Sequence, residues 1–398
     1  MSEESFSLKK IAIPAFGPSL MYGLCNGAIL PVVALSAREM GASVAVSGFI
    51  AALIGIGSLF NNIPAALIAA RFGERRSIIG AAFFSMLALL ICAVAPYVWL
   101  LGVGVFMVGM AASVFLLARQ AYLAEAVPLY LRARAMSTLG GTTRIGTFIG
   151  PFAGAAFIHY MGLSGAYLIA AIAMMLGGIL AWWSPELEAR PEHTAEPGAR
   201  GPTMLDILRS HYKVLSTLGL GVMLIAVLRS SRQVVIPLWA YQLGLDATVI
   251  SLIYGLVAAV DMSVFYPAGK VMDKHGRIWV AVPCALFMGG SLLLMPFTSE
   301  PIGFVIVALV LGFGNGIGSG IVMTLAADAS PVQGRTRFLG LWRLMHDVGA
   351  SGGPALLSGI TGLAGLATGI FTIGLAGLVA AWVFWRWLPR THPGHPGA

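Results

Sequence analysis

Long apolar runs dominate this sequence and limit what it can fold into. A helix that crosses a bilayer needs roughly 20 apolar residues, and this chain of 398 residues supplies about twelve such runs between short polar breaks. Only 10% of its residues are charged, whereas soluble proteins carry about a quarter. The runs lack the period-two alternation of transmembrane barrel strands. The sequence therefore predicts an all-α membrane protein with twelve transmembrane helices.

The expected spans follow from the apolar runs. The polar start MSEESFSLKK is followed by no small-residue cleavage site, so we expect no signal peptide, and the first span itself targets the chain. We expect transmembrane helices over residues 11–34, 43–70, 77–95, 98–122, 135–159, 166–183, 214–242, 248–268, 278–297, 301–326, 338–363 and 364–387.

Basic residues predict the orientation of these spans. Connections rich in Lys and Arg stay in the cytoplasm. Among the basic residues of the predicted connections, only Arg38 falls on the non-cytoplasmic side. The net charge of +8 reflects this asymmetry rather than a nucleic-acid surface. We therefore expect a multi-pass protein of the cell membrane with both termini cytoplasmic. The basic residues on the expected cytoplasmic side are Lys9, Lys10, Arg71, Arg75, Arg76, Arg132, Arg134, Lys270, Lys274, Arg277, Arg335, Arg337, Arg386 and Arg390.

One long polar segment, residues 184–213, interrupts the apolar runs. It is rich in Pro, Glu and Arg, and such a composition cannot bury enough apolar surface to fold alone. We interpret it as a cytoplasmic linker between an N-terminal six-helix bundle, residues 1–183, and a C-terminal six-helix bundle, residues 214–398.

The two halves repeat each other. A constant offset of 203 residues aligns glycines, prolines and charges over much of their length, which chance does not produce. Repeated helical halves across a central linker are typical of transporters whose halves move about a site near the membrane midplane. The aligned pairs are Pro64 with Pro267, Arg71 with Lys274, Gly73 with Gly276, Gly109 with Gly312, Glu125 with Asp328, Pro128 with Pro331, Arg132 with Arg335, Arg134 with Arg337, Gly146 with Gly349, Gly150 with Gly353 and Pro151 with Pro354.

The loop after the second span of each half carries a family resemblance. The copies are ALIAARFGERR, residues 66–76, and GKVMDKHGR, residues 269–277. They resemble the G-x-L-x-D-R-x-G-R-K loop of the major facilitator superfamily, and the resemblance covers essentially the whole chain. It implies conformational roles for Arg71, Gly73, Asp273 and Gly276.

By this resemblance, Asp273 would face the cytoplasmic end of the fifth span and hold the two halves together in the outward-facing state. A carboxylate is stabilised at the positive N-terminus of a helix, and glycine permits the tight turn. The first copy has Ala70 in place of the acid, so its lock would be weaker. The alternative is a basic loop that serves only topology.

The fifth span contains a second motif, RIGTFIGPFAGA, residues 144–155. Its Gly146, Gly150, Pro151 and Gly154 resemble the G-x-x-x-G-P-x-x-G-G pattern of drug:proton antiporters in the same superfamily, with Ala155 in place of the final glycine. Small residues let helices approach closely, and proline bends a helix, as a moving contact requires. The alternative is ordinary small-residue packing.

Polar residues inside the spans are candidate binding groups, because a charge near the bilayer centre costs roughly 2.5–3.5 kcal/mol. The resemblance implies that the first, fourth, seventh and tenth spans line a central cavity. No carboxylate is buried in the first half, so we expect an anionic or zwitterionic substrate rather than a cationic one. For Arg119 the alternative is snorkelling to the cytoplasmic surface. The candidate substrate-binding residues are Asn26, Arg119, Gln120, Arg229, Arg232, Gln233 and Asn315.

Proton coupling needs a group that gains and loses a proton as its surroundings change, and the candidates are Asp261, His346 and Asp347. Arg144 and Asp261 fall at similar depths in the fifth and eighth spans, which would face each other across the halves. We predict an ion pair between them that opens or closes during the cycle. The alternatives are that Arg144 bonds backbone carbonyls of its own half and that His346 is only a hydrogen-bond partner.

These features favour a proton-driven exporter of a small organic compound, such as a drug-efflux antiporter. The first alternative is a proton symporter that imports an anionic metabolite or vitamin, and the second is a non-transporting membrane protein such as a sensor. The GFGNGIGSG run, residues 312–320, is not a phosphate loop, so ATP-driven transport has no support.

Enzymatic chemistry is disfavoured, because no nucleophile has a convincing base. Cys25, Cys92 and Cys284 lie in separate spans and match no metal spacing, so we expect neither metal nor cofactor. We expect a monomer in the lipid bilayer whose partners are its small-molecule substrate and protons, with no nucleic acid.

Overall fold

The computed structural model describes residues 12–127, 129–183, 204–331 and 333–388. Every regular element within these residues is helical. Lys9, Lys10, Arg390 and residues 184–203 of the predicted linker lie outside the described residues. The all-α prediction is therefore confirmed over the described chain.

The helices follow the predicted spans closely. Those of the N-terminal part are α1 (Ala12–Ile29), α2 (Val33–Glu39), α3 (Val44–Phe72), α4 (Glu74–Val94), α5 (Val98–Ala126), α6 (Leu129–Met161) and α7 (Leu163–Trp182). The C-terminal part contains α8 (Met204–Ser210), α9 (Tyr212–Val214), a π-helical turn (Leu215–Gly219), α10 (Leu220–Gln242), α11 (Ala247–His275), α12 (Ile278–Leu294), a 3-10 turn (Met295–Phe297), α13 (Pro301–Ile317), α14 (Ile321–Ala329), α15 (Arg335–Ala364) and α16 (Leu366–Trp387).

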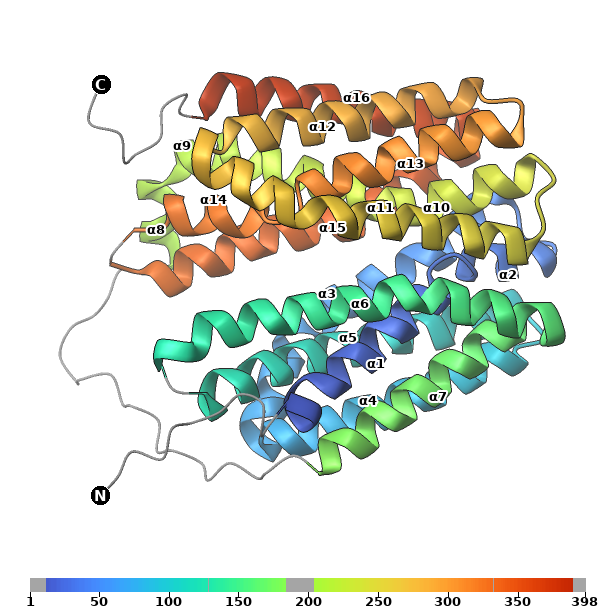
Figure 1. Ribbon diagram of the computed structural model, residues 1–398, viewed down its shortest axis with the longest axis horizontal. Helices are drawn as coiled ribbons and strands as arrows, with labels where there is room; N and C mark the ends of the chain where they lie inside the picture. The colour runs from blue at the N-terminus through green and yellow to red at the C-terminus, as the bar shows by residue number, and fades with distance from the viewer. Residues whose placement is uncertain (1–11, 128, 184–203, 332, 389–398) are drawn as a thin grey trace. The chain divides into compact units, whose positions relative to one another are not determined.

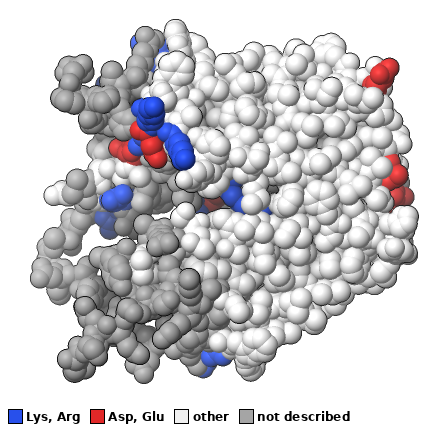
Figure 2. Space-filling model, in the orientation of Figure 1, with Lys and Arg blue, Asp and Glu red and all other residues white. Residues whose placement is uncertain are grey.

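Ten helical segments of the described chain are long and apolar enough to cross a membrane. The predicted spans 135–159 and 338–363 are not among them, although α6 and α15 have 33 and 30 residues, respectively. These two helices have the lowest apolar character of the long helices because they carry several Arg, Thr and Gly residues. The protein is a membrane protein, and twelve spanning helices are consistent with its elements. Much of the face in Figure 2 is free of charged side chains.

Two predicted spans are interrupted. The predicted span 11–34 ends as α1 at Ile29, and α2 begins after Pro31, which lacks the backbone N–H that a continuous helix needs. The predicted span 301–326 divides into α13 and α14 around Gly318–Gly320, where glycine favours a break. Irregular backbone at membrane depth is tolerated only where protein or a cavity surrounds it.

The predicted linker 184–213 is not irregular throughout. Its end forms α8, whose Ile207 is buried and which packs against α15. An apolar residue every few positions in MLDILRS gives this short helix a face to bury, which the composition of the whole segment conceals.

The chain forms two compact units. One contains α1, α2, α4 to α7 and most of α3, and the other contains α8 to α10, α12 to α16 and most of α11. Residues 44–52 of α3 group with the second unit and residues 246–255 of α11 with the first. Within the first unit α1 lies along α6, as Figure 1 shows, and within the second α10 packs against α15.

Glycine brings these helix pairs into backbone contact. A Cβ atom on Gly146 of α6 would lie 2.2 Å from the Leu20 carbonyl oxygen of α1, and one on Gly150 would lie 2.4 Å from that of Leu24. The second unit repeats the arrangement, since a Cβ on Gly349 of α15 would lie 2.2 Å from the Met223 carbonyl oxygen of α10. The repeat in sequence is thus a repeat in packing.

We predict that Gly146→Val destabilises the first unit by about 2 kcal/mol or more, because the added side chain would separate α6 from α1. The measurement is thermal unfolding of the purified protein in detergent. Gly140→Val is the matched control on the same helix, since a Cβ there meets no atom within 4 Å. Equal melting temperatures for the two variants would contradict the prediction.

Candidate functional site

A polar cluster lies among α10, α11 and α13 of the second unit. Asp261 of α11 accepts hydrogen bonds at its Oδ2 atom from Asn315 Nδ2 at 2.5 Å and from Arg232 Nη2 at 3.3 Å. The side chains of Arg232 and Asp261 are only 14% and 13% exposed. The structure therefore brings together two candidate substrate-binding residues, Arg232 and Asn315, and the proton-coupling candidate Asp261.

Arg229 joins this cluster through the break between α13 and α14. It lies one turn before Arg232 on α10, and its Nη2 atom donates to the Gly318 carbonyl at 2.5 Å. A Cβ on Gly318 would lie 2.1 Å from Cys284 Sγ, and a Cβ on Gly316 would lie 2.5 Å from the Asp261 carbonyl oxygen. The glycines of residues 312–320 thus allow the broken helix to approach the charged residues.

The hydrogen bonds of the cluster leave several buried donors unused, and the buried Asn315 Oδ1 acceptor also has no hydrogen-bond partner among the described residues. The cluster contains the guanidinium groups of Arg229 and Arg232 and one carboxylate, that of Asp261, so its local charge is positive. Arg229 Nε, Arg232 Nε and Arg232 Nη1 are buried and have no hydrogen-bond partner among the described residues. Buried donors without partners are rare in proteins, and each calls for a ligand, an ion or water. An anionic group of a ligand fits these donors, because guanidinium groups bind carboxylates and phosphates with paired hydrogen bonds.

A second cationic group lies in the first unit. Arg119 of α5 is 4% exposed, and its Cζ atom lies 5.4 Å from the centre of the Phe115 ring. Phe115 stacks on Tyr22 of α1, with ring centres 5.1 Å apart. The Arg119 Nη2 atom is buried with no hydrogen-bond partner among the described residues. The guanidinium therefore does not snorkel to the surface.

The other candidate binding residues lie on helices that contribute to these two groups. Asn26 of α1 donates from Nδ2 to the Tyr22 carbonyl at 3.2 Å, one turn earlier on the same helix. Gln120 and Gln233 follow Arg119 and Arg232 directly, and both are half-buried. Their contact with a substrate stays a prediction.

The proton-coupling candidates on α15 form a separate chain of contacts. His346 Nδ1 lies 3.3 Å from Asp347 Oδ1, and Arg343 Nε lies 3.8 Å from Asp347 Oδ2. These side chains are between a quarter and about half exposed. The ion pair between Arg144 and Asp261, which would join the two units, stays a prediction, as do the transport roles of the α15 residues.

The motif glycines have clear structural positions. Gly73 and Gly276 adopt φ of 78° and 99°, a conformation that favours glycine, so both turns depend on them. Arg71 and Asp273 are exposed, and the predicted lock between Asp273 and the fifth span stays untested. Gly146, Gly150 and Pro151 pack against α1 in their own unit, and Gly154 lies against Ala28, while the role of this motif in transport stays a prediction.

One ion pair of the structure was not predicted from the sequence. Arg277, just before α12, donates from Nε to Asp328 Oδ2 of α14 at 2.9 Å, and its Nη2 atom lies 3.5 Å from Oδ1. The sequence assigned Arg277 only to topology, and the offset of 203 residues places Glu74 at its position in the first copy. No local sequence signal indicates this pair, because Arg277 and Asp328 are 51 residues apart and meet only in the folded unit.

The family follows from this fold and from comparison with known proteins. The sequence pattern of the Major Facilitator Superfamily matches residues 18–228 and 218–398. The chain belongs to the major facilitator superfamily. Members of this superfamily are carriers of small molecules, so the protein is a membrane transporter and not an enzyme.

Its similar proteins include named drug efflux systems. Multidrug resistance protein MdtG of Escherichia fergusonii is 27% identical over 196 residues, which cover 48% of this chain and 48% of that protein. A multi-drug resistance efflux pump PmrA homologue of Lactococcus lactis is 26% identical over 279 residues, covering 68% and 67%. The chain thus matches about half the length of the MdtG relatives.

Solved structures share the fold of this superfamily member. The D-xylose-proton symporter has a TM-score of 0.76 at 18% identity and covers 96% of this chain and 98% of its own. A POT family transporter in complex with a thioalcohol-conjugated peptide has a TM-score of 0.78 at 13% identity and covers 95% of each chain. The fold is therefore shared at sequence identities of 13% and 18%, at which the binding residues of two proteins can differ.

We predict that Asp261→Asn lowers the stability of the protein by about 3 kcal/mol, because the buried Arg232 then lacks its carboxylate partner. Adding Arg232→Gln to this variant should recover part of the loss. Thermal unfolding in detergent measures both effects.

Two further comparisons test which arginine is coupled to Asp261. A double variant less stable than Asp261→Asn would contradict the pairing of Arg232 with Asp261. Transport activity tests the predicted pair between Arg144 and Asp261. If the pair exists, Arg144→Gln should reduce activity less in the Asp261→Asn variant than in the wild type.

Proposed function

We propose that this transporter exports a small organic zwitterion or anion in exchange for protons. The named efflux relatives and the antiporter-like motif at residues 146–155 support export. The cationic character of the two polar sites supports a substrate with a negative group. The coupling ion, the direction and the substrate class are the proposed parts.

Arg119 is the single observation that carries the substrate class. A buried guanidinium is costly in a membrane protein, and Arg119 has a ring beneath it but no carboxylate partner among the described residues. In an exporter of cations a charge of this sign would repel the substrate. A carboxylate or phosphate on the substrate would supply the missing partner, and Phe115 and Tyr22 would offer an aromatic surface beside it.

Asp261 supports coupling to protons. A zwitterion could bind Arg229 and Arg232 through its anionic group and Asp261 through its ammonium group. Protonation of Asp261 would then remove the second contact, so that the proton and the substrate exclude each other. Mutual exclusion is what antiport requires, and it gives Asp261 a role that a simple structural ion pair would not need.

The same geometry supports one alternative, a proton symporter of a simple anion. Protonation of Asp261 would release Arg232, which lies 3.3 Å away, and the freed guanidinium would bind an anion more tightly. Proton and anion would then travel together. An importer of an anionic metabolite would use the same residues in this way.

Transport in everted membrane vesicles separates the two. We expect a zwitterionic probe to accumulate inside vesicles with an acidic lumen and to leave when a protonophore is added, whereas a matched probe without its amine should accumulate less. Movement of the anionic probe out of the lumen together with protons would support the symporter instead. If neither probe responds to the gradient, proton coupling is wrong.

We also predict that Arg119→Gln and Arg232→Gln each weaken binding of the anionic group about tenfold or more, the loss expected for one hydrogen bond to a charged group. Arg386→Gln is the control, because Arg386 lies at the end of α16 over the Trp387 ring. Apparent affinity from concentration-dependent uptake measures the effect. Unchanged affinity in both α5 and α10 variants would point to a neutral or cationic substrate.

A further inference from the structure

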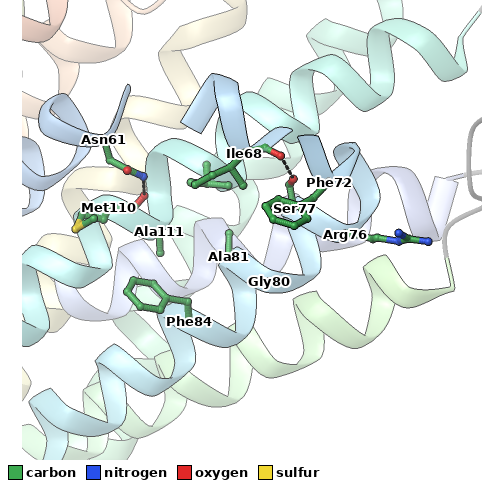
Figure 3. A pocket seen from close by; sticks show the side chains of 11 residues that line it. Asn61, Ile68, Phe72, Arg76, Ser77, Gly80, Ala81, Phe84, Met110 and Ala111 are labelled. Atoms are coloured by element: carbon green, nitrogen blue, oxygen red, sulfur yellow. Dashed lines mark hydrogen bonds between the residues drawn. The ribbon is translucent and has the colours of Figure 1, made fainter. Parts of the chain in front are cut away.

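An apolar pocket of about 390 Å³ lies within the first unit, between α3, α4 and α5. Its volume falls in the range of small-molecule sites, roughly 300–1,000 Å³. None of the candidate substrate-binding residues lines it. Figure 3 shows its lining residues, which are Asn61, Ile68, Phe72, Arg76, Ser77, Gly80, Ala81, Phe84, Met110, Ala111 and Val114.

The pocket begins where close packing between α3 and α5 ends. A Cβ on Gly109 of α5 would lie 2.1 Å from the Ile54 carbonyl oxygen, and Asn61 Nδ2 donates to the Met110 carbonyl at 2.9 Å. These contacts hold the two helices together on one side of the pocket. On the other side α4 presents Gly80, where an added Cβ would meet no atom within 4 Å. The missing side chain at Gly80 leaves the space open.

The lining offers an occupant almost no hydrogen bonds. The Ser77 hydroxyl donates to the Gly73 carbonyl at 2.7 Å, and the Asn61 amide is engaged with Met110 and with Ser113 Oγ. The remaining side chains are apolar apart from Arg76. A polar solute would lose its hydration here without replacement, so the pocket suits a hydrocarbon chain.

The mouth of the pocket opens on a surface suited to lipid. Phe72 and Phe84 line the pocket and are 55% and 39% exposed, so the pocket reaches the surface beside two apolar side chains. The helices α3 and α4 are apolar enough to span a membrane, and apolar side chains exposed on such helices are suited to contact with acyl chains. A lipid chain can therefore enter the pocket from the side.

The end of the pocket carries positive charge. Arg76 stands in the first turn of α4, and its guanidinium points away from the apolar lining in Figure 3. The turn from residue 71 to 76 contains Arg71, Arg75 and Arg76 against Glu74, so its charge is positive. Guanidinium groups at a membrane boundary attract anionic headgroups and bind phosphate well.

We propose that this pocket binds one acyl chain of an anionic phospholipid, with the headgroup phosphate at Arg76. The acyl chain lies along Gly80, Ala81 and Ala111, where the helices leave space. The site is independent of the direction and substrate of transport. Occupancy of the site beside the turn between α3 and α4 would then depend on the lipid composition of the surrounding leaflet.

The test uses the full chain purified in detergent and a phosphatidylglycerol with a photoreactive group at the end of one acyl chain. We expect labelling of peptides from α4 and α5, and Gly80→Leu should weaken it about tenfold, as expected when roughly two methylene groups lose their burial. Gly290→Leu is the matched control, because a Cβ at Gly290 of α12 also meets no atom within 4 Å. Gly80→Ala should give a smaller loss, and it keeps the test available if Gly80→Leu does not fold.

Arg76→Gln examines the headgroup. The wild type should label more strongly with phosphatidylglycerol than with the matching phosphatidylcholine probe, and the variant should lose this preference while keeping the acyl contact. Labelling that Gly80→Leu leaves unchanged, or that maps away from α4 and α5, would overturn the proposal. So would displacement of the probe by a transported compound but not by unlabelled phosphatidylglycerol.

Discussion

Backbone contact between helices is the interaction on which this structure depends. A helix in lipid gains little from burying apolar side chains against another helix, because the lipid is equally apolar, so close packing has to hold the bundle together. Gly146 and Gly150 let α6 touch the backbone of α1, and Gly349 does the same between α15 and α10. The helices held in this way carry Arg144 and the α15 charges at fixed positions.

The same constraint explains where the protein is not tightly packed. At Gly318 the missing side chain admits Arg229 to a backbone carbonyl, and at Gly80 it leaves a pocket that no neighbour fills. Glycine therefore has opposite effects in one molecule, since it draws helices together where a partner backbone is near and leaves space where none is. The polar cluster and the apolar pocket both arise beside such positions.

Much of the fold followed from the sequence, because apolar length and the repeat are local or regular signals. The helical class, the turns at Gly73 and Gly276 and the family could be predicted from residues alone. The pairing of Asp261 with Arg232 and Asn315 could not, since it depends on how three helices rotate about their axes. The break at Gly318–Gly320 was equally hidden, because glycine occurs both in continuous membrane helices and at their ends.

The ion pair between Arg277 and Asp328 has a consequence for the ancestry of the chain. At the matching positions the first copy carries Glu74 and Glu125, two groups of like charge, and Arg75 instead donates to the Trp182 carbonyl. A duplicated ancestor would have carried the same pair of residues at these positions in both copies, so at least one copy has diverged. The halves are no longer interchangeable, and a chain assembled from two first copies would bring acid to the position where the second copy has its arginine.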